Sequence, residues 1–324
     1  MEDYMKRHNK SINIVKILLL LALVFVLCGC RRTVSPYTKA PIDSTDAGSD
    51  TDDPAYSEDI TEGFVGTMEI EGNDYPVFLF EGLCYCLYED HAIVVNTMFS
   101  DDTLEEYTIH ALISYESVDY PVTELDEELF YLNTEAKTIN LPSTLLAIGD
   151  NAFDGCSNLQ QINLPEGLEY IGQSAFTDCT SLKSITIPST VKQLGSELFF
   201  GCTALETVIF NEGVSYIPDG AFSNCESLVT VVIPSTMKTI GGEAFWSCIA
   251  LKNLTLPEGI NTIADRCFYD CEALTELVLP TSITSIGDDL FDYCESLTTL
   301  KVPDDSKDRY AELMEGYEFE VVGY

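Results

Sequence analysis

Cysteine is the residue type in this sequence whose spacing most strongly suggests chemistry. Seven cysteines recur at a constant interval of 23 residues, at Cys156, Cys179, Cys202, Cys225, Cys248, Cys271 and Cys294. Thiols that converge in space could form disulfides or bind a metal ion such as zinc. Thiols spread along a repeating structure would instead serve as small buried side chains. The choice between these interpretations depends on the elements that carry the cysteines.

The cysteines belong to a repeat that also fixes the positions of other residue types. A phenylalanine precedes each of them by three residues and a leucine follows by three, as in Phe153, Cys156 and Leu159. A proline recurs at the same period, with Asn211 as its one substitute. One repeat reads A-F-x-x-C-x-x-L-x-x-I-x-L-P-x-x-L-x-x-I-G. A fixed period between about 20 and 50 residues is the signature of a solenoid.

Each repeat predicts one short strand, because apolar residues alternate before the proline, as at Ile185 and Ile187. Stacked repeats then predict a parallel sheet with neighbouring strands about 4.8 Å apart. The Ala-Phe pair predicts a short helical or 3₁₀ segment on the outer side, which makes the expected fold an α/β solenoid. One repeat cannot fold alone, since its six large side chains contribute roughly 1.5–3 kcal/mol each while ordering it costs roughly 35 kcal/mol.

In such a stack, one cysteine per turn does not converge on a metal site. Stacked equivalents have parallel Cβ vectors and an odd number cannot pair completely, so we expect a buried ladder of free thiols. Disulfides between neighbouring turns are the alternative, because an exported protein permits them. Cys267 replaces an alanine of the repeat and is expected to fill the core. Cys84 and Cys86 share one strand face, which is too weak a pattern to indicate redox activity.

Histidine offers little support for catalysis. Beyond the first thirty residues the chain contains only His91 and His110. Their acidic neighbours Asp90, Glu105 and Glu106 are expected in so acidic a chain. The sequence contains no nucleophile elbow, phosphate loop or zinc signature. We therefore expect no catalytic residue, metal or cofactor, and a hydrolase using the region before the repeats is the enzymatic alternative.

The charge of the chain restricts its partners. Its 324 residues carry 54 Asp and Glu against 16 Lys and Arg, a net charge of −38. Such a surface repels phosphate backbones, so we expect the protein not to bind nucleic acids.

Strand positions between the inward pairs face outward and form the candidate binding surface. A β-branched row runs across five of these strands. The candidate ligand-binding residues are Thr186, Thr207, Ile209, Thr230, Val232, Asn253, Thr255, Glu276 and Val278. An apolar row on a preformed surface suits a docking partner, although β-branched residues are also simply good strand formers.

The residues after the proline alternate between Glu-Gly and Ser-Thr, which predicts a double unit of 46 residues. Only the Gly form favours a positive φ, so alternate turns should differ in backbone. Glu166, Glu212 and Glu258 fall on one edge about 10 Å apart. Single carboxylates at that distance cannot share a calcium ion, so a solvated acidic edge is expected.

The N-terminus predicts export. Lys6, Arg7, Lys10 and Lys16 precede an apolar run from Ile17 to Leu27. This run is too short for a membrane span of about 20 residues and fits a secretory signal.

The sequence Leu27-Cys28-Gly29-Cys30 that follows resembles the lipobox of bacterial lipoproteins, with Cys30 as the lipidated residue. An uncleaved signal anchor is the alternative. From Pro41 to Glu62 the chain has eight acidic residues and no Lys or Arg, which predicts a disordered tether.

The repeat A-F-x-x-C-x-x-L-x-x-I-x-L-P resembles the BspA-type (treponemal) leucine-rich repeats of bacterial cell surfaces. Tyr120-Pro121-Val122-Thr123 resembles the family's entry segment, and Lys301-Val302-Pro303 with Tyr310 is similar to its exit. The resemblance covers roughly residues 83–320. It implies a right-handed leucine-rich-repeat solenoid with the sheet on its concave face, and a secreted or surface-anchored interaction protein, sometimes an adhesin. It implies no particular ligand.

These observations predict a signal peptide at 1–29, an acidic linker at 30–62, a β-rich cap region at 63–124, repeats at 125–303 and a C-terminal cap at 304–324. The expected function is binding of an extracellular protein or glycan-bearing macromolecule by a lipid-anchored, extracytoplasmic monomer at the cell surface. A structural spacer of the cell envelope without a specific ligand is the alternative.

Overall fold

The computed structural model describes residues 64–70, 72–95, 103–314 and 316–324. The chain forms two compact units. Unit 1 contains the described residues up to 95 together with 112–122, and unit 2 contains 103–111 and 123–324. The predicted signal peptide, Cys30 and the acidic linker lie outside the described residues. No described helix is long and apolar enough to cross a membrane.

Unit 1 is an antiparallel β structure. Successive hairpins join β1 (Phe64–Ile70), β2 (Asn73–Phe80), β3 (Leu83–Tyr88) and β4 (His91–Val95), and a further hairpin joins β6 (Leu112–Tyr115) to β7 (Val118–Leu125). Two of the two-residue connections, Glu81-Gly82 and Glu116-Ser117, have positive φ at both positions, which matches the twist of the strands that they join. Cys84 and Cys86 of β3 are fully buried in the core of this unit.

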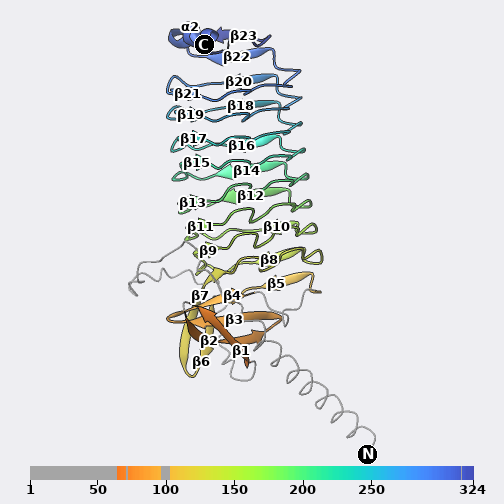
Figure 1. Ribbon diagram of the computed structural model, residues 1–324, viewed down its shortest axis with the longest axis vertical. Coiled ribbons are helices and arrows are strands. Elements are labelled where there is room, and N and C mark those ends of the chain that lie inside the picture. The colour runs from red at the N-terminus through yellow and green to blue at the C-terminus, as the bar shows by residue number, and fades with distance from the viewer. Residues whose placement is uncertain (1–63, 71, 96–102, 315) are drawn as a thin grey trace, which may run out of the picture. The chain divides into compact units, whose positions relative to one another are not determined.

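Unit 2 is a solenoid of stacked turns, each of which contributes two short parallel strands (Figure 1). The period of 23 residues sets the register, as in the pair Ser184 and Thr207. The first strand series is β5 (Glu106–Thr108), β8 (Thr138–Asn140), β10 (Gln161–Ile162), β12 (Ser184–Ile187), β14 (Thr207–Phe210), β16 (Thr230–Val232), β18 (Asn253–Thr255), β20 (Glu276–Val278) and β22 (Thr299–Val302). The second series is β9 (Ala147–Ile148), β11 (Tyr170–Ile171), β13 (Gln193–Leu194), β15 (Tyr216–Ile217), β17 (Thr239–Ile240), β19 (Thr262–Ile263) and β21 (Ser285–Ile286).

The parallel strands of the first series form three blocks instead of one continuous sheet. The blocks are β5–β8–β10, β12–β14–β16 and β18–β20–β22. On the N-terminal side of each break, the inward residues Leu164, Val231 and Ile233 are only half-buried, whereas Val208 and Phe210 of β14, in the middle of a block, are buried. On the other side of each break, the inward residues of β12 and β18, such as Ile187 and Leu254, are buried. The interior is therefore less tightly closed on the N-terminal side of each break.

The second series also divides, between β13 and β15, and here a side chain explains the break. The Tyr216 hydroxyl accepts a hydrogen bond from the Leu194 N–H at 2.5 Å and donates one to the Leu194 carbonyl at 3.0 Å. The Tyr216 hydroxyl thus forms hydrogen bonds with the N–H and the carbonyl of Leu194, which would otherwise pair with the next strand.

The expectation of a helical or 3₁₀ segment after the Ala-Phe pair is wrong: the outer segments are irregular turns. Left-handed residues recur in each of them, such as Asn151 (φ 54°) and Gly155 (φ 75°), and these interrupt a helix. Backbone N–H groups of the outer segments donate to carbonyl groups of the next turn, as the Phe153 N–H does to Ala175 O at 2.8 Å. The outer segments thus add a third set of bonds between turns.

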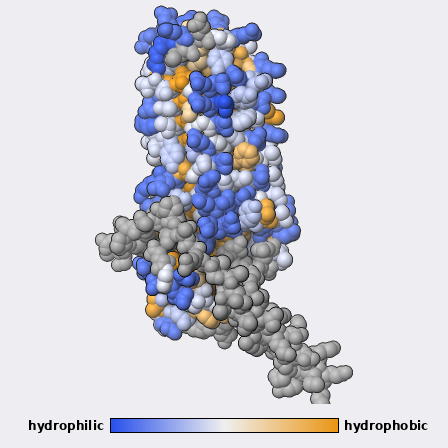
Figure 2. Space-filling model, viewed as in Figure 1, coloured by the Kyte–Doolittle hydropathy of each residue, from blue (hydrophilic) through white to orange (hydrophobic). Residues whose placement is uncertain are grey.

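Phenylalanines form a continuous stack through the interior of unit 2. The rings from Phe130 to Phe291 lie 5.0–5.9 Å apart between centroids and are tilted by no more than 18°. Those from Phe153 to Phe268 are fully buried. The face of the molecule shown in Figure 2 is mostly hydrophilic, with smaller hydrophobic areas between.

The C-terminal segment closes the last turn. A 3₁₀ helix, η1 (Asp304–Ser306), leads into α2 (Lys307–Leu313), and β23 (Glu320–Gly323) pairs in parallel with β22. Tyr310 is fully buried and its hydroxyl donates to Pro280 O at 2.6 Å. These elements lie in the segment 304–324, where the sequence predicted a C-terminal cap.

Candidate binding surface

The predicted binding residues lie on the outward side of the first strand series. Burial alternates along β12 and β14, so that Thr186, Thr207 and Ile209 face outward between buried Ile187, Val208 and Phe210. The same alternation leaves Asn253 and Thr255 exposed on either side of buried Leu254. We call this side of β12, β14, β16, β18, β20 and β22 the strand face.

The structure divides the β-branched row into two parts. Thr186, Ile209 and Val232 are direct neighbours in register, and Thr255, Val278 and Lys301 form the second run. Val232 and Thr255 flank the break between β16 and β18 and are not paired. The structure therefore brings together Thr186, Thr207, Ile209, Thr230 and Val232 as one group, and Asn253, Thr255, Glu276 and Val278 as another. Val232 is the most open apolar member, with 46% of its surface exposed.

The strand face carries no net charge although the chain is strongly acidic. Its two charged residues, Glu276 and Lys301, form an ion pair with 2.7 Å between Oε2 and Nζ. The other outward positions of β12 to β22 are hydroxyl, amide or aliphatic side chains. A partner can approach this face without the repulsion or attraction that the rest of the surface exerts.

Two shallow hollows lie beside β10, next to the first break in the strand series. One, of about 100 Å³, is lined by β8 and β10 and includes Asn140, Gln161 and Asn163. The other, of about 130 Å³, includes Asn163, Ser184 and Thr186. Of their linings, only Thr186 belongs to the predicted set. Alternation places Asn140, Gln161, Asn163 and Ser184 outward, but it does not indicate the break between β10 and β12, where the second hollow lies.

Hydrogen bonds between neighbouring turns explain the alternation of Glu-Gly and Ser-Thr. Glu212 accepts bonds from the N–H and the hydroxyl of Ser235 at 3.0 and 2.9 Å, and these lower the pKa of Glu212. The Gly213 N–H donates to Thr236 Oγ1 at 2.9 Å, and the same hydroxyl donates to Val214 O at 2.7 Å. Each Glu-Gly turn is thus joined to the Ser-Thr turn that follows.

The glutamate edge is more than the solvated acidic edge that the sequence suggested. The expected difference in backbone is present, because Gly167, Gly213 and Gly259 all have φ between 106° and 119°. The carboxylates of Glu212 and Glu258 are bound by Ser235 and Thr281 of the following turns. Their role is to connect turns.

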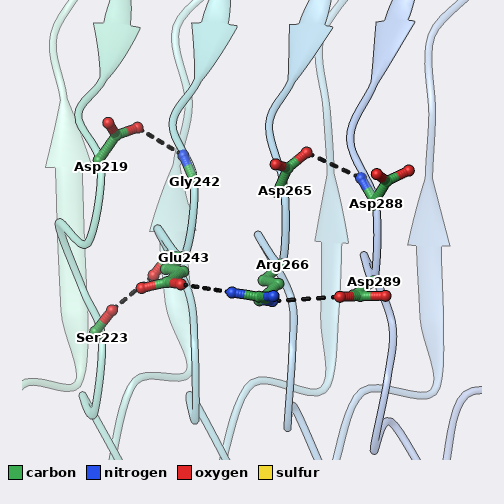
Figure 3. Close-up of polar contacts among 8 residues, drawn as sticks. All are labelled: Asp219, Ser223, Gly242, Glu243, Asp265, Arg266, Asp288 and Asp289. Atoms are coloured by element: carbon green, nitrogen blue, oxygen red, sulfur yellow. Dashed lines mark hydrogen bonds and ion pairs between the residues drawn. The ribbon is translucent and has the colours of Figure 1, made fainter.

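Acidic residues also connect the outer segments (Figure 3). Asp219 accepts a bond from Gly242 N–H at 2.7 Å, and Asp265 accepts one from Asp288 N–H at 2.9 Å. Arg266 lies between Glu243 and Asp289, at 3.5 and 3.3 Å. Much of the acidity of unit 2 therefore stabilises the stack.

The cysteine column is buried, as predicted, except for the half-buried Cys294 at its end, and it has a second role that the sequence did not indicate. Each thiol donates to the phenylalanine carbonyl of the preceding turn, as Cys202 does to Phe176 O at 3.0 Å. The ten cysteines among the described residues are free, and Cys267 is fully buried as expected. Burial raises the pKa of Cys156 to about 12, so this thiol is uncharged at neutral pH. The column is a structural ladder.

The two histidines lie in or beside the strands of the region before the repeats. The His91 ring contacts Tyr88 at 5.3 Å between centroids, and its Nδ1 lies 3.0 Å from Asp90 Oδ1. His110 precedes β6 in the chain. Within the described residues, no group of three His, Cys, Asp or Glu side chains is arranged to hold a metal ion.

The repeat, its register and its recurring phenylalanines and cysteines are those of a known family. A family model for the BspA type leucine rich repeat region matches residues 123–251 and 199–314, in six copies. The chain belongs to this family. The resemblance inferred from the A-F-x-x-C repeat is confirmed, and so is the leucine-rich-repeat solenoid fold.

Several solved structures of leucine-rich repeat proteins are similar to the chain. A leucine rich repeat protein of T. pallidum is 30% identical over 76% of this chain and 99% of its own, with a TM-score of 0.49. A leucine rich cell surface protein of Faecalibacterium prausnitzii is 19% identical, with 72% and 96% covered and a TM-score of 0.38. The pneumococcal vaccine antigen PcpA is 17% identical, with 76% and 98% covered and a TM-score of 0.32. No curated relative matches the chain.

Proposed function

We propose that this BspA-type protein is exported, anchored outside the cell membrane by a lipid on Cys30, and uses its strand face to bind an extracellular protein or glycan-bearing macromolecule. The observation that carries the proposal is the neutrality of the strand face in a chain of net charge −38. Stacked turns hold this face rigid, so little conformational entropy is lost when a partner binds. Val232 and Ile209 supply an apolar centre surrounded by hydroxyl groups.

The test places charge on that apolar centre. The double variant Ile209→Lys and Val232→Lys should lose binding to a panel of extracellular proteins and immobilised glycans. Both side chains reach solvent, so thermal unfolding should change little. Ile249→Lys is the matched control, since Ile249 is an aliphatic residue with 36% of its surface exposed outside the strand series.

A ligand lost by the double variant and retained by Ile249→Lys supports the proposal. Equal capture of every ligand by the two variants contradicts it. Capture of no ligand by the wild-type chain would instead favour the spacer alternative.

The anchor has its own test. Cells expressing the chain should incorporate a labelled fatty acid into it, and Cys30→Ala should release it from the membrane fraction. Cys28→Ala is the control, because only Cys30 fits the lipidated position of the lipobox. Retention of Cys30→Ala at the membrane would contradict lipid anchoring and favour an uncleaved signal anchor.

A further inference from the structure

The outer segments of three consecutive turns carry an aromatic cluster, which consists of Trp246, Tyr269 and Tyr293. The ring centroids of Trp246 and Tyr269 are 5.4 Å apart at an interplanar angle of 67°. Those of Tyr269 and Tyr293 are 5.0 Å apart at 53°. Tyr293 has 64% of its surface exposed, and the other two are half-buried. The three rings thus form one continuous surface across the stack.

The fold does not require these rings. The interior of the same turns is filled by the phenylalanine stack. The position of Trp246 and Tyr269 is aromatic in two other turns, at Tyr131 and Phe200, but is occupied by Asp154, Thr177 and Ser223 in three more, so the repeat folds without a ring there. Tyr293 has a left-handed backbone, with φ at 63°. That conformation favours glycine, asparagine and aspartate over an aromatic residue. An aromatic side chain that is both exposed and conformationally disfavoured indicates a role outside the core.

Carboxylates alternate with the rings. Asp292 holds the Trp246 position in the third turn, and Asp270 holds the Tyr293 position in the second. Desolvation and a hydrogen bond to Tyr293 raise the pKa of Tyr269, and the nearby charge of Asp292 raises it further. Glu272 also lies on this surface and is exposed.

The surroundings of the aromatic cluster are strongly anionic. Residues 243–249, 266–272 and 289–295 contain six carboxylates and one cation, which leaves a net charge of −5. The cation, Arg266, is ion-paired on both sides with Glu243 and Asp289 (Figure 3). The carboxylates nearest the rings, such as Asp270 and Asp292, therefore have no basic side chain from these segments as an ion-pair partner.

We propose that the aromatic cluster and its carboxylates bind the arginine and lysine side chains of a basic, extended protein segment. The faces of Trp and Tyr rings attract cations, and a planar guanidinium can stack on a ring while it bonds to a carboxylate. Three turns span about 10 Å, which is the length of about three extended residues. Alternate basic residues of one segment can therefore reach rings in different turns. This site shares no residue with the strand face.

The test uses Trp246 as a reporter, because it is the only tryptophan in the chain. The full chain is titrated with the blocked peptide Arg-Gly-Arg-Gly-Arg while Trp fluorescence is recorded. We expect saturable quenching that weakens at least tenfold between 50 mM and 500 mM salt. A peptide with citrulline in place of arginine keeps the shape without the charge and should produce no quenching.

Tyr293→Asn is the decisive variant, because it removes a ring without changing charge and places asparagine in a backbone that favours it. We expect at least a tenfold loss of affinity. Asp292→Asn should also weaken binding, whereas Tyr131→Ala should not, although 47% of the Tyr131 surface is exposed. Thermal unfolding of each variant confirms its fold. Absent quenching, equal affinity for the citrulline peptide or unchanged affinity of Tyr293→Asn would overturn the proposal, as would quenching by a neutral oligosaccharide alone.

Discussion

Cys294 differs from the other thiols of its column because it lies at the end and is only half-buried. A hydrogen bond with Cys271 lowers the pKa of Cys294 and raises that of Cys271, whose burial raises it further. The thiolate is the reactive form, so iodoacetamide at pH 7.5 should modify Cys294 first among the seven column cysteines. Peptide mass mapping measures the order. In denaturant all seven should react alike, and native labelling of Cys156 as fast as Cys294 would contradict the prediction.

Glu212 makes the stability of the stack depend on pH. Hydrogen bonds from Ser235 lower its pKa, so its contribution to folding is present above the unfolded value of about 4.3. That contribution is lost as pH falls through the lower folded pKa. We expect Glu212→Gln to unfold more easily in urea at pH 7 and to lose less stability than wild type below pH 4.5. The exposed Glu226→Gln is the control, and an identical pH profile for the two variants would refute this role.

At the scale of the element, two equivalent glycines provide a matched pair. Gly167 and Gly213 have φ of 115° and 119°, so alanine should cost about 1 kcal/mol or more at either position. A Cβ at Gly213 would lie 2.4 Å from Ser189 O, whereas one at Gly167 would lie 3.7 Å from Ser143 O. Gly213→Ala should therefore be the more destabilising variant in urea unfolding. Equal losses would mean that the backbone moves to relieve the contact.

The strands and their register could be predicted because they follow from side chains that repeat. Ile185 and Ile187 recur as Val208 and Phe210, and stacking them in phase determines which strands are neighbours. The breaks could not be predicted, since Val231 and Ile233 have the same apolar character as their equivalents within a block. The division of the binding row between Val232 and Thr255 was missed for the same reason.

The conformation of the outer segments could not be predicted from the sequence for a different reason. Left-handed positions there are occupied by residues as varied as Ser174, Glu197 and Arg266, so composition did not reveal a conformation that only the stacked neighbour stabilises. The aromatic cluster did have a signal in the sequence, since Trp246 and Tyr269 are 23 residues apart. This spacing does not separate the two rings from core residues, because the core phenylalanines recur at the same period.

The solenoid is held together mainly by contacts between neighbouring turns, so the position of a defect determines how far its effect spreads. Phe199 stacks on Phe176 and Phe222, at 5.3 and 5.6 Å, in the middle of unit 2. Phe291 lies in the last cysteine-bearing turn, where Tyr317 and Phe319 cover its edge. Removing either ring creates a cavity worth about 3–5 kcal/mol.

The two cavities should differ in what they unfold. Phe291→Ala should increase hydrogen exchange mainly from residue 268 to the C-terminus, because the preceding turns keep both neighbours. Phe199→Ala should increase exchange on both sides of the defect, since it uncouples the two halves of the stack. Phe200→Ala, which removes a ring with 36% of its surface exposed beside Phe199, should leave exchange near wild type. A uniform increase over all of unit 2 for both core variants would show that the solenoid unfolds as one cooperative body and not turn by turn.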